Sequence, residues 1–152
     1  MLELRTELLF ELNVELGEVL DFGAAPHGNR RLASLKGGTF AGPKLRGEVL
    51  LGGSDWVLGR PDNAREVDAR VTLHTDDGHL IYTTYRGINT LSPDILGRIT
   101  RGETVDPSEY YLRISPVFET GSEKYGWLNR IVTVGLGERT RTAVIFTVYS
   151  IL

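Results

Sequence analysis

The sequence predicts an all-β fold, a single antiparallel β-barrel of about eight to ten strands with one short helix. Apolar and polar residues alternate through several segments, an Asp-Gly turn separates two of them, and 18 glycines are spread along the chain. Helical periodicity appears in one short segment only. Because so many strands in one sheet leave two edges to protect, closure into a barrel is the arrangement that we expect.

The first predicted strand covers residues 2–16. Its even positions are Leu, Leu, Thr, Leu, Phe, Leu, Val and Leu, and most of the charge lies at odd positions. This period of two places apolar side chains on one face. The alternation returns at residues 67–74 and stops at Asp76-Asp77-Gly78, a strong hairpin signal, so residues 79–86 are the expected return strand.

The remaining elements are assigned from shorter patterns. Further strands are predicted at residues 30–36, 44–51, 56–60, 110–116, 128–136 and 142–151, with a last hairpin turn at 137–139. The helix is predicted at residues 92–101, where Ser92 caps and Pro93 suits the first turn. Loops follow at 102–109 and 119–125. No repeat or linker divides the chain, so we expect one domain, residues 1–152.

Composition narrows the choice of partners. The net charge is -3 and the 17 basic residues are scattered, which argues against nucleic acid and membrane surfaces. There is no cysteine. Glutamates at positions 3, 7, 11 and 15 interrupt the apolar N-terminus, unlike a signal peptide, so we expect a soluble, cytoplasmic protein. The expected partner is a small organic ligand or substrate, and homodimerisation is left open.

The glycine-rich segment 37–56 offers the first candidate site. Its six glycines are expected at bends and bulges of the barrel, and they are followed by Asp55 and Trp56. Neighbours on a strand face opposite sides, so one of these two side chains points inward. If Asp55 does, its buried carboxylate has a raised pKa and suits a general base. The alternative is a turn aspartate that caps backbone N–H groups after Gly52-Gly53.

Two later segments supply further candidates. Tyr111 and Arg113 share one strand face, and Arg113 suits an anionic oxygen, or a structural pair with Glu119 or Asp55. Trp127 and Asn129 share another strand face. They suit an aromatic wall and an amide donor in a ligand pocket. Alternatively, Trp127 packs the barrel end and Asn129 ties a loop. Tyr82 is expected to supply a phenol to the same space.

The sequence contains no motif for a metal site, a nucleophilic serine or a phosphate-binding loop. His27, His74 and His79 lack metal-ligand spacing. Ser54 lies in no GxSxG elbow, and the glycines form no phosphate loop. We therefore predict neither a metal nor a cofactor.

Several motifs in fixed order resemble a known family. The segments GGTFAGP, LRGEVLLGGSDW, ARVTLHTDDGHLIY, YYLRISPVFET and YGWLNRIVTVGLGER are similar to those of domain of unknown function 3237, a bacterial family of small β-barrel proteins. The likeness spans residues 2–152, with Ser54 in place of an expected alanine. It implies a barrel and assigns no reaction. The motif positions are Gly53, Asp55, Trp56, Asp76, Asp77, Gly78, Tyr111, Arg113, Phe118, Glu119, Trp127 and Asn129.

The sequence favours a cofactor-independent enzyme that applies acid/base catalysis to a small organic molecule in the barrel mouth, as an isomerase, cyclase, or lactone or epoxide hydrolase. A lipocalin-like binding protein without catalysis is the alternative, and a filled barrel that serves as an interaction module is a third reading. The predicted catalytic residues are Asp55, Arg113, Tyr111 and Glu119. The predicted substrate-binding residues are Trp56, Tyr82, Trp127 and Asn129.

Overall fold

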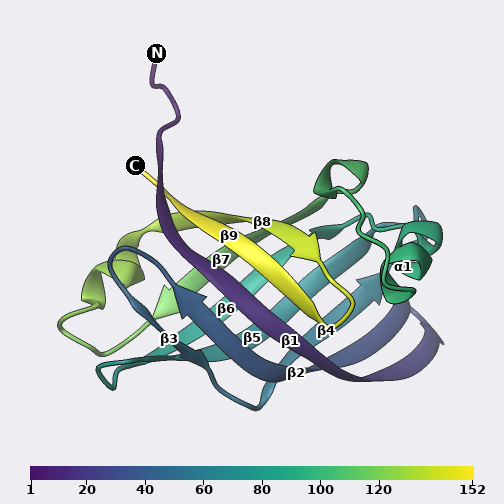
Figure 1. Ribbon diagram of the computed structural model, residues 1–152, viewed down its shortest axis with the longest axis horizontal. Helices are drawn as coiled ribbons and strands as arrows, with labels where there is room; N and C mark the ends of the chain where they lie inside the picture. Colours follow the sequence, from purple (N-terminus) through teal and green to yellow (C-terminus); the bar gives the residue numbers. More distant parts are fainter.

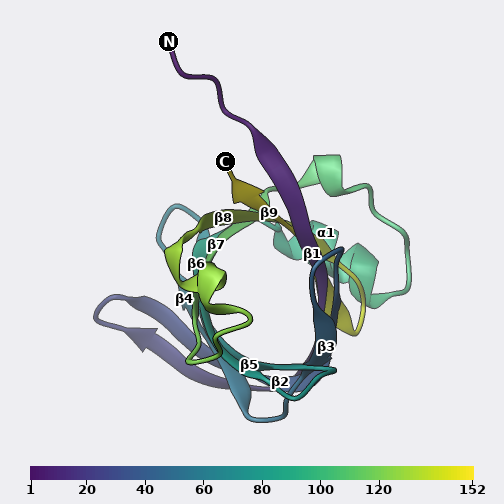
Figure 2. The same cartoon turned by 90° about the vertical axis from the view of Figure 1, so that its left-hand side faces the viewer.

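The computed structural model describes residues 1–152 and contains one antiparallel sheet of nine strands that curls into a barrel (Figures 1 and 2). The predicted all-β class, the antiparallel barrel and the single α-helix are confirmed. The strands are β1 (Thr6–Ala25), β2 (Gly28–Ala41), β3 (Arg46–Val49), β4 (Gly53–Gly59), β5 (Arg65–Thr75), β6 (Leu80–Asn89), β7 (Leu112–Glu119), β8 (Val132–Arg139) and β9 (Ala143–Ile151). The helices are α1 (Pro93–Thr100) and the short 3-10 helices η1 (Pro107–Glu109) and η2 (Gly126–Arg130).

Two short strands, β3 and β4, together occupy one strand position of the barrel, between β2 and β5. The order is β1-β9-β8-β7-β6-β5-β3-β2-β4, with further pairings of β1 with β2 and of β5 with β4. Strand β3 pairs with the end of β5 at Leu73–Thr75, and β4 pairs with the beginning of β5 at Arg65–Arg70. Both also pair with β2. The barrel therefore has about eight strand positions, a size that side chains fill or that holds one small ligand.

The first strand is longer than predicted. It begins at Thr6 and continues to Ala25, whereas the alternation ends at Leu16. Residues 18–22 are exposed on both faces, because there the β1–β2 hairpin extends beyond the core. A strand with two solvated faces has no reason to alternate, so its sequence carries no period of two. Residues 1–5 precede β1 and extend away from the barrel (Figure 2).

Two other predicted boundaries are wrong. Residues 128–130, predicted as strand, belong to η2, and β8 begins at Val132. The predicted turn at 137–139 lies within β8, and the β8–β9 turn is at 140–142. Gly137 faces Leu112 instead of making a turn: a Cβ atom there would lie 2.4 Å from Leu112 Cγ. This glycine provides room inside the barrel.

Glycine does allow a bend where β2 crosses β1. Gly37 and Gly38 have φ angles of 98° and 148°, and the pairing of β1 with β2 shifts register between Val14 and Leu16. A Cβ atom at Gly38 would lie 1.9 Å from the Asn13 carbonyl oxygen. A side chain is excluded at this bulge, as the glycine pattern predicts.

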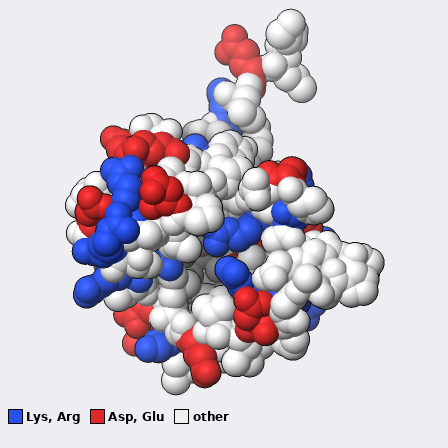
Figure 3. Space-filling view, turned by 90° about the vertical axis from the view of Figure 1, so that its right-hand side faces the viewer, with Lys and Arg blue, Asp and Glu red and all other residues white.

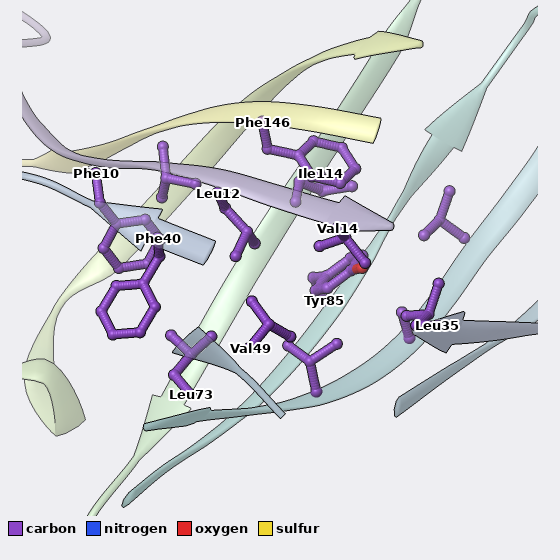
Figure 4. Packing of buried hydrophobic residues seen from close by; sticks show 14 of the residues in the cluster. Phe10, Leu12, Val14, Leu35, Phe40, Val49, Leu73, Tyr85, Ile114 and Phe146 are labelled. Atoms are coloured by element: carbon purple, nitrogen blue, oxygen red, sulfur yellow. The ribbon is translucent and has the colours of Figure 1, made fainter. Parts of the chain in front are cut away.

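The core is a cluster of 25 buried residues from most of the strands (Figure 4). At the end near η2, Phe10 packs edge-on against Phe40 and Phe118, with ring centroids 5.5 and 5.8 Å apart. Leu128 of η2 lies fully buried there. The Tyr125 hydroxyl donates to Asp77 at 3.0 Å, which ties the loop before η2 to the β5–β6 turn. This end is packed shut.

Helix α1 lies at the other end of the barrel (Figure 1). Ser92 caps it as predicted, accepting a hydrogen bond from the Ile95 N–H at 3.2 Å. No helix of the chain is long and apolar enough to cross a membrane.

Candidate functional site

A cavity of about 370 Å³ occupies the end of the barrel beside α1. It lies among residues of eight strands, all except β3, and two leucines contribute to its wall, Leu91 before α1 and Leu96 within it. Most of the lining is apolar, including Val14, Val67 and Phe146. Its mouth opens on the face shown in Figure 3, where basic side chains surround a hollow. Its volume is within the range typical of small-molecule sites.

Strand β4 directs Asp55 into this cavity. Val57, two residues along the strand, lines the cavity with Asp55, whereas Trp56 between them is exposed on the outer surface. The cross-strand partners of Asp55 are Ala33 and Ala69. Because both partners are alanines, no large side chain covers the carboxyl group from its own sheet.

Burial makes the Asp55 carboxyl group a stronger base than an exposed aspartate. Its pKa is raised from 3.8 to about 6, mainly by removal from water and also by the nearby Asp68 charge, while a hydrogen bond opposes the rise. In that bond the Asp68 N–H donates to Asp55 Oδ1 at 3.0 Å. No cationic side chain contributes to the pKa of Asp55. The group is thus buried and hydrogen-bonded to backbone, without a salt bridge.

Tyr85 lies in the same transverse row of the sheet. Ala69 of β5 pairs with Asp55 on one side and with Tyr85 of β6 on the other. The Tyr85 ring is buried, lines the cavity and packs edge-on against Phe146 at 5.5 Å. Burial and the Asp55 charge both raise the pKa of its phenol, so Tyr85 stays neutral and can donate a hydrogen bond.

Four arginines also line the cavity: Arg31, Arg65, Arg139 and Arg141. Arg65 and Arg139 are half-buried. Burial lowers the pKa of each guanidinium, and a neighbouring positive charge lowers it further, that of Arg31 for Arg65 and that of Arg65 for Arg139. Arg65 Nη2 donates to the Leu91 carbonyl oxygen at 2.6 Å, and Arg139 Nη1 donates to the Thr140 carbonyl oxygen. Both guanidinium groups bond to backbone oxygens and to no carboxylate.

Of the eight predicted site residues, only Asp55 lines this cavity. The expected polar face of β7 points outward: Leu112, Ile114 and Phe118 face the core, while Tyr111 and Glu119 are exposed. The Arg113 guanidinium lies 4.9 Å from the Tyr111 ring centroid on that outer side. Alternation separates the two faces of a strand without showing that the polar one meets a pocket, and here the apolar face, through Leu112, meets the cavity.

The other predicted binding residues also lie elsewhere. Tyr82 is 45% exposed on the outer face of β6, and Trp56 is 43% exposed and stacks on Phe22 at 6.2 Å. Trp127 packs against the core at the closed end. Asn129 accepts from the Thr120 N–H at 2.8 Å and donates to its carbonyl oxygen at 2.9 Å. The structure therefore matches the alternative interpretation of both residues: Trp127 packs at the end of the barrel, and Asn129 holds a loop by hydrogen bonds to Thr120.

Sequence reasoning missed Arg65, Tyr85 and Arg139. Arg65 is two residues before Val67, and Tyr85 is two and four residues after Thr83 and Ile81, so the same alternation that identifies the core places them inside. The signal was present for Tyr85, because its neighbour Arg86 marks the outer face. Arg139 was assigned to a turn, which concealed that it continues the inner face of β8.

A closed antiparallel barrel, packed at one end and hollow at the other around a buried carboxyl group, defines a class of small β-barrel proteins with an internal cavity. The chain belongs to the family described as "Protein of unknown function (DUF3237)", whose model matches residues 4–151. The resemblance noted in the sequence is thereby confirmed.

Two proteins of known structure are similar to this chain over almost their whole length. The UPF0311 protein RPA1785 of Rhodopseudomonas palustris is 34% identical over 149 residues, 98% of this chain and 97% of that protein. Its crystal structure aligns with the present structure over 100% of each chain, with a TM-score of 0.91. A β-barrel-like protein from Acinetobacter baumannii, 37% identical, has a TM-score of 0.86 over 100% of this chain and 98% of its own.

A more distant relative has a named activity. The hydroalkoxylation enzyme phnH of Penicillium herquei is 27% identical over 129 residues, which cover 85% of this chain and 71% of that protein. The crystal structure of an enzyme from Penicillium herquei, 24% identical to this chain, has a TM-score of 0.71 over 98% of this chain and 95% of its own. That structural likeness shows a shared fold.

Proposed function

We propose that the chain is an enzyme that needs no cofactor and moves a proton between Asp55 and a small organic molecule held in the cavity. The observation that carries the proposal is the buried Asp55 carboxyl group, which faces a cavity of ligand size and has no cationic partner. Burying a carboxylate without a counter-charge is costly, and such groups gather at functional sites. The distant relation to a hydroalkoxylation enzyme supports the same proposal.

The pKa of Asp55 suits proton transfer in both directions. With a pKa of about 6, the group is mostly ionised at neutral pH and is more basic than an ordinary aspartate. It accepts a proton from a hydroxyl group or an acidic carbon of the substrate and, once protonated, returns a proton to another atom. The Tyr85 phenol, in the same row, is positioned to donate a hydrogen bond to an oxygen on which negative charge develops.

Among such reactions, intramolecular addition of a hydroxyl group to a conjugated C=C bond fits these groups. Asp55 takes the hydroxyl proton, the oxygen forms a bond to one alkene carbon, and the electron pair of the C=C bond moves onto the conjugated carbonyl as an enolate. Protonated Asp55 then gives its proton to the other alkene carbon, so no proton is gained or lost overall. Isomerisation uses the same two transfers, and hydrolysis of a lactone or an epoxide uses Asp55 to activate water.

The alternative function is that of a lipocalin-like carrier, which the apolar lining of the cavity favours. A carrier binds its ligand without moving a proton. In that case Asp55→Asn alters affinity alone, and the wild-type protein returns every ligand unchanged.

The experiment compares wild type, Asp55→Asn and the matched control Asp76→Asn on a panel of hydroxy-enones, unsaturated lactones and epoxides. Asp76 is exposed on the β5–β6 turn at the packed end, so its substitution makes the same chemical change away from the cavity. Reactions are run in D₂O and followed by NMR, because ring closure leaves one solvent deuterium on carbon. We expect turnover that Asp55→Asn lowers by about 10²–10⁴-fold and Asp76→Asn leaves unchanged. Equal turnover by Asp55→Asn and wild type would refute the proposal.

The pH dependence provides a second test. We expect kcat/KM to rise with pH through about pH 6 and then level off, since the ionised form of Asp55 starts the reaction. Asp68→Asn removes a negative charge that raises the pKa of Asp55, so the rise should move to lower pH. A profile with no inflection in this range, or an upward movement, would count against Asp55 as the base.

A further inference from the structure

Two of the cavity's arginines have no counter-charge in the protein. Arg65 and Arg139 are half-buried, and each guanidinium is placed where another arginine repels it. Arg65 donates to the backbone carbonyl oxygen of Leu91, and Arg139 donates to that of Thr140. By contrast, Arg31 at the same mouth bonds to Asp21 at 3.3 Å. Gathering unpaired positive charge in a partly dry site costs free energy that an anion would offset.

The chemistry around the pair selects among anions. A guanidinium presents a planar fork that matches the two oxygens of a carboxylate. The walls beside the pair are apolar, with Val67, Leu112 and Phe146 on three different strands. A fully hydrated inorganic anion gains nothing from such walls, whereas a carboxylate attached to an apolar body fills both parts of the cavity.

The positively charged side chains and Asp55 lie at different depths in the cavity. The arginines belong to the strand ends and loops at the mouth: Arg65 begins β5, Arg139 ends β8, and Arg141 is in the β8–β9 turn. Asp55 lies further along the barrel, paired with Ala69 four residues into β5 from Arg65. Four residues of a strand span about 13 Å, so a molecule with a carboxylate at the mouth places its far end at Asp55.

We propose that the cavity is selective for a small carboxylic acid with an apolar, ring-sized body, whose carboxylate binds Arg65 and Arg139 while its reacting group reaches Asp55. The inference rests on the proposed function for the role of Asp55, but the binding itself does not require a proton to move. The two arginines then determine which class of substrate binds and how the bound substrate is oriented in the cavity.

The test measures the binding of cinnamate, an apolar ring with a carboxylate, against neutral cinnamamide and inorganic sulfate, by calorimetry and thermal shift. The variants are Arg65→Gln with Arg139→Gln, Asp55→Asn, and the control Arg70→Gln on the outer face of β5. We expect the wild type to bind cinnamate at least about tenfold more tightly than cinnamamide. The double variant should lose that preference, and Arg70→Gln should keep it. Removal of mutually repelling charges leaves the double variant folded, and cinnamamide binding provides its folding control.

The outcomes separate this inference from the proposed function. Equal binding of acid and amide, or sulfate binding as tight as that of cinnamate, overturns the selectivity for carboxylic acids. Such a result leaves the D₂O experiment on Asp55 free to succeed. Conversely, Asp55→Asn that keeps both turnover and cinnamate binding overturns the catalytic role and supports the carboxylate site. Loss of the preference in Arg70→Gln as well would attribute it to surface charge and overturn the assignment to the Arg65–Arg139 pair.

Discussion

The two ends of the barrel are built from the same strands and differ in what those strands place inside. At the end near η2, Phe10, Phe40 and Phe118 interlock and the loop before η2 is tied down through Asp77. At the end near α1, alanines flank Asp55 and the interior is a cavity of about 370 Å³. Strand β5 shows the change within one inner face, from Leu73 in the packed part to Val67 at the cavity.

This difference indicates that the end near η2 stabilises the fold, whereas the end near α1 holds the groups suited to chemistry. Interlocked aromatic rings remove apolar area from water and leave no void, which stabilises the fold. The hollow end instead keeps an unpaired carboxyl group and two mutually repelling arginines, all of which cost stability. Proteins retain such costs where a function requires them.

The largest effect should follow from opening the packed end. Phe10→Ala removes a fully buried ring from between Phe40 and Phe118, and we expect a loss of about 3–5 kcal/mol in the free energy of unfolding. Urea unfolding measures the loss, with the exposed Phe22→Ala as the control. A cost below about 1 kcal/mol would mean that this end is not the packed part of the barrel.

A pair of tyrosines on β6 tests which face carries the chemistry. Tyr85 lines the cavity, and Tyr82, three residues before it, is exposed outside. On a substrate found in the panel, Tyr85→Phe should lower kcat by about 10–100-fold through loss of one hydrogen-bond donor, while Tyr82→Phe should leave it unchanged. The reverse ranking in steady-state kinetics would restore the prediction made from sequence.

Substitutions of two valines on β5 test whether the cavity has room for a larger side chain. Val67 lines the cavity and Val71, four residues later on the same inner face, does not. Val71→Phe should cost about 1–3 kcal/mol by overpacking, whereas Val67→Phe should cost less and block ligand binding. Thermal unfolding and cinnamate calorimetry on both variants measure this. Equal costs would argue that the cavity is filled in solution.

The smallest effect is expected where a predicted site residue ties a loop. Asn129→Ala removes two hydrogen bonds to Thr120 at the packed end and should cost about 1 kcal/mol. Turnover should stay at the wild-type level because the cavity is at the opposite end. A variant with normal stability and lost turnover would reassign Asn129 to the site.

Sequence reasoning recovers the fold where one face of a strand is buried. The alternation in residues 67–74 and the turn after it correctly predict β5, β6 and their hairpin. It misses residues 17–25 of β1, of which 18–22 are exposed on both faces, and it assigns residues 128–130 of η2 to a strand. Neither segment is a strand with one buried face, so neither carries the corresponding period of two.

The site is less predictable than the fold because it depends on which face is hollow. Asp55 could be found from its place after a glycine-rich bend. Arg113 and Tyr111 have the same alternation as a pocket-lining pair, yet the buried Leu112 and Ile114 turn them outward. Arg65 and Arg139 reach the same cavity only because the sheet is curved, since β6 and β7 separate β5 from β8. No local pattern contains that information.

The central claim, that the hollow end keeps an ionisable carboxyl group at a cost, is tested most directly by the melting temperature of Asp55→Asn against wild type across pH. The pKa of Asp55 is about 6 in the fold against an ordinary value of 3.8, so ionisation destabilises the fold as pH rises between these values.

Below about pH 4 the group is protonated in both folded and unfolded chains and the penalty vanishes. We therefore predict that the advantage of Asp55→Asn grows by about 3 kcal/mol, roughly 6–12 °C, between about pH 4 and about pH 8. A difference that stays constant with pH, or a wild type that gains on the variant as pH rises, would contradict the account and make Asp55 a structural hydrogen-bond acceptor.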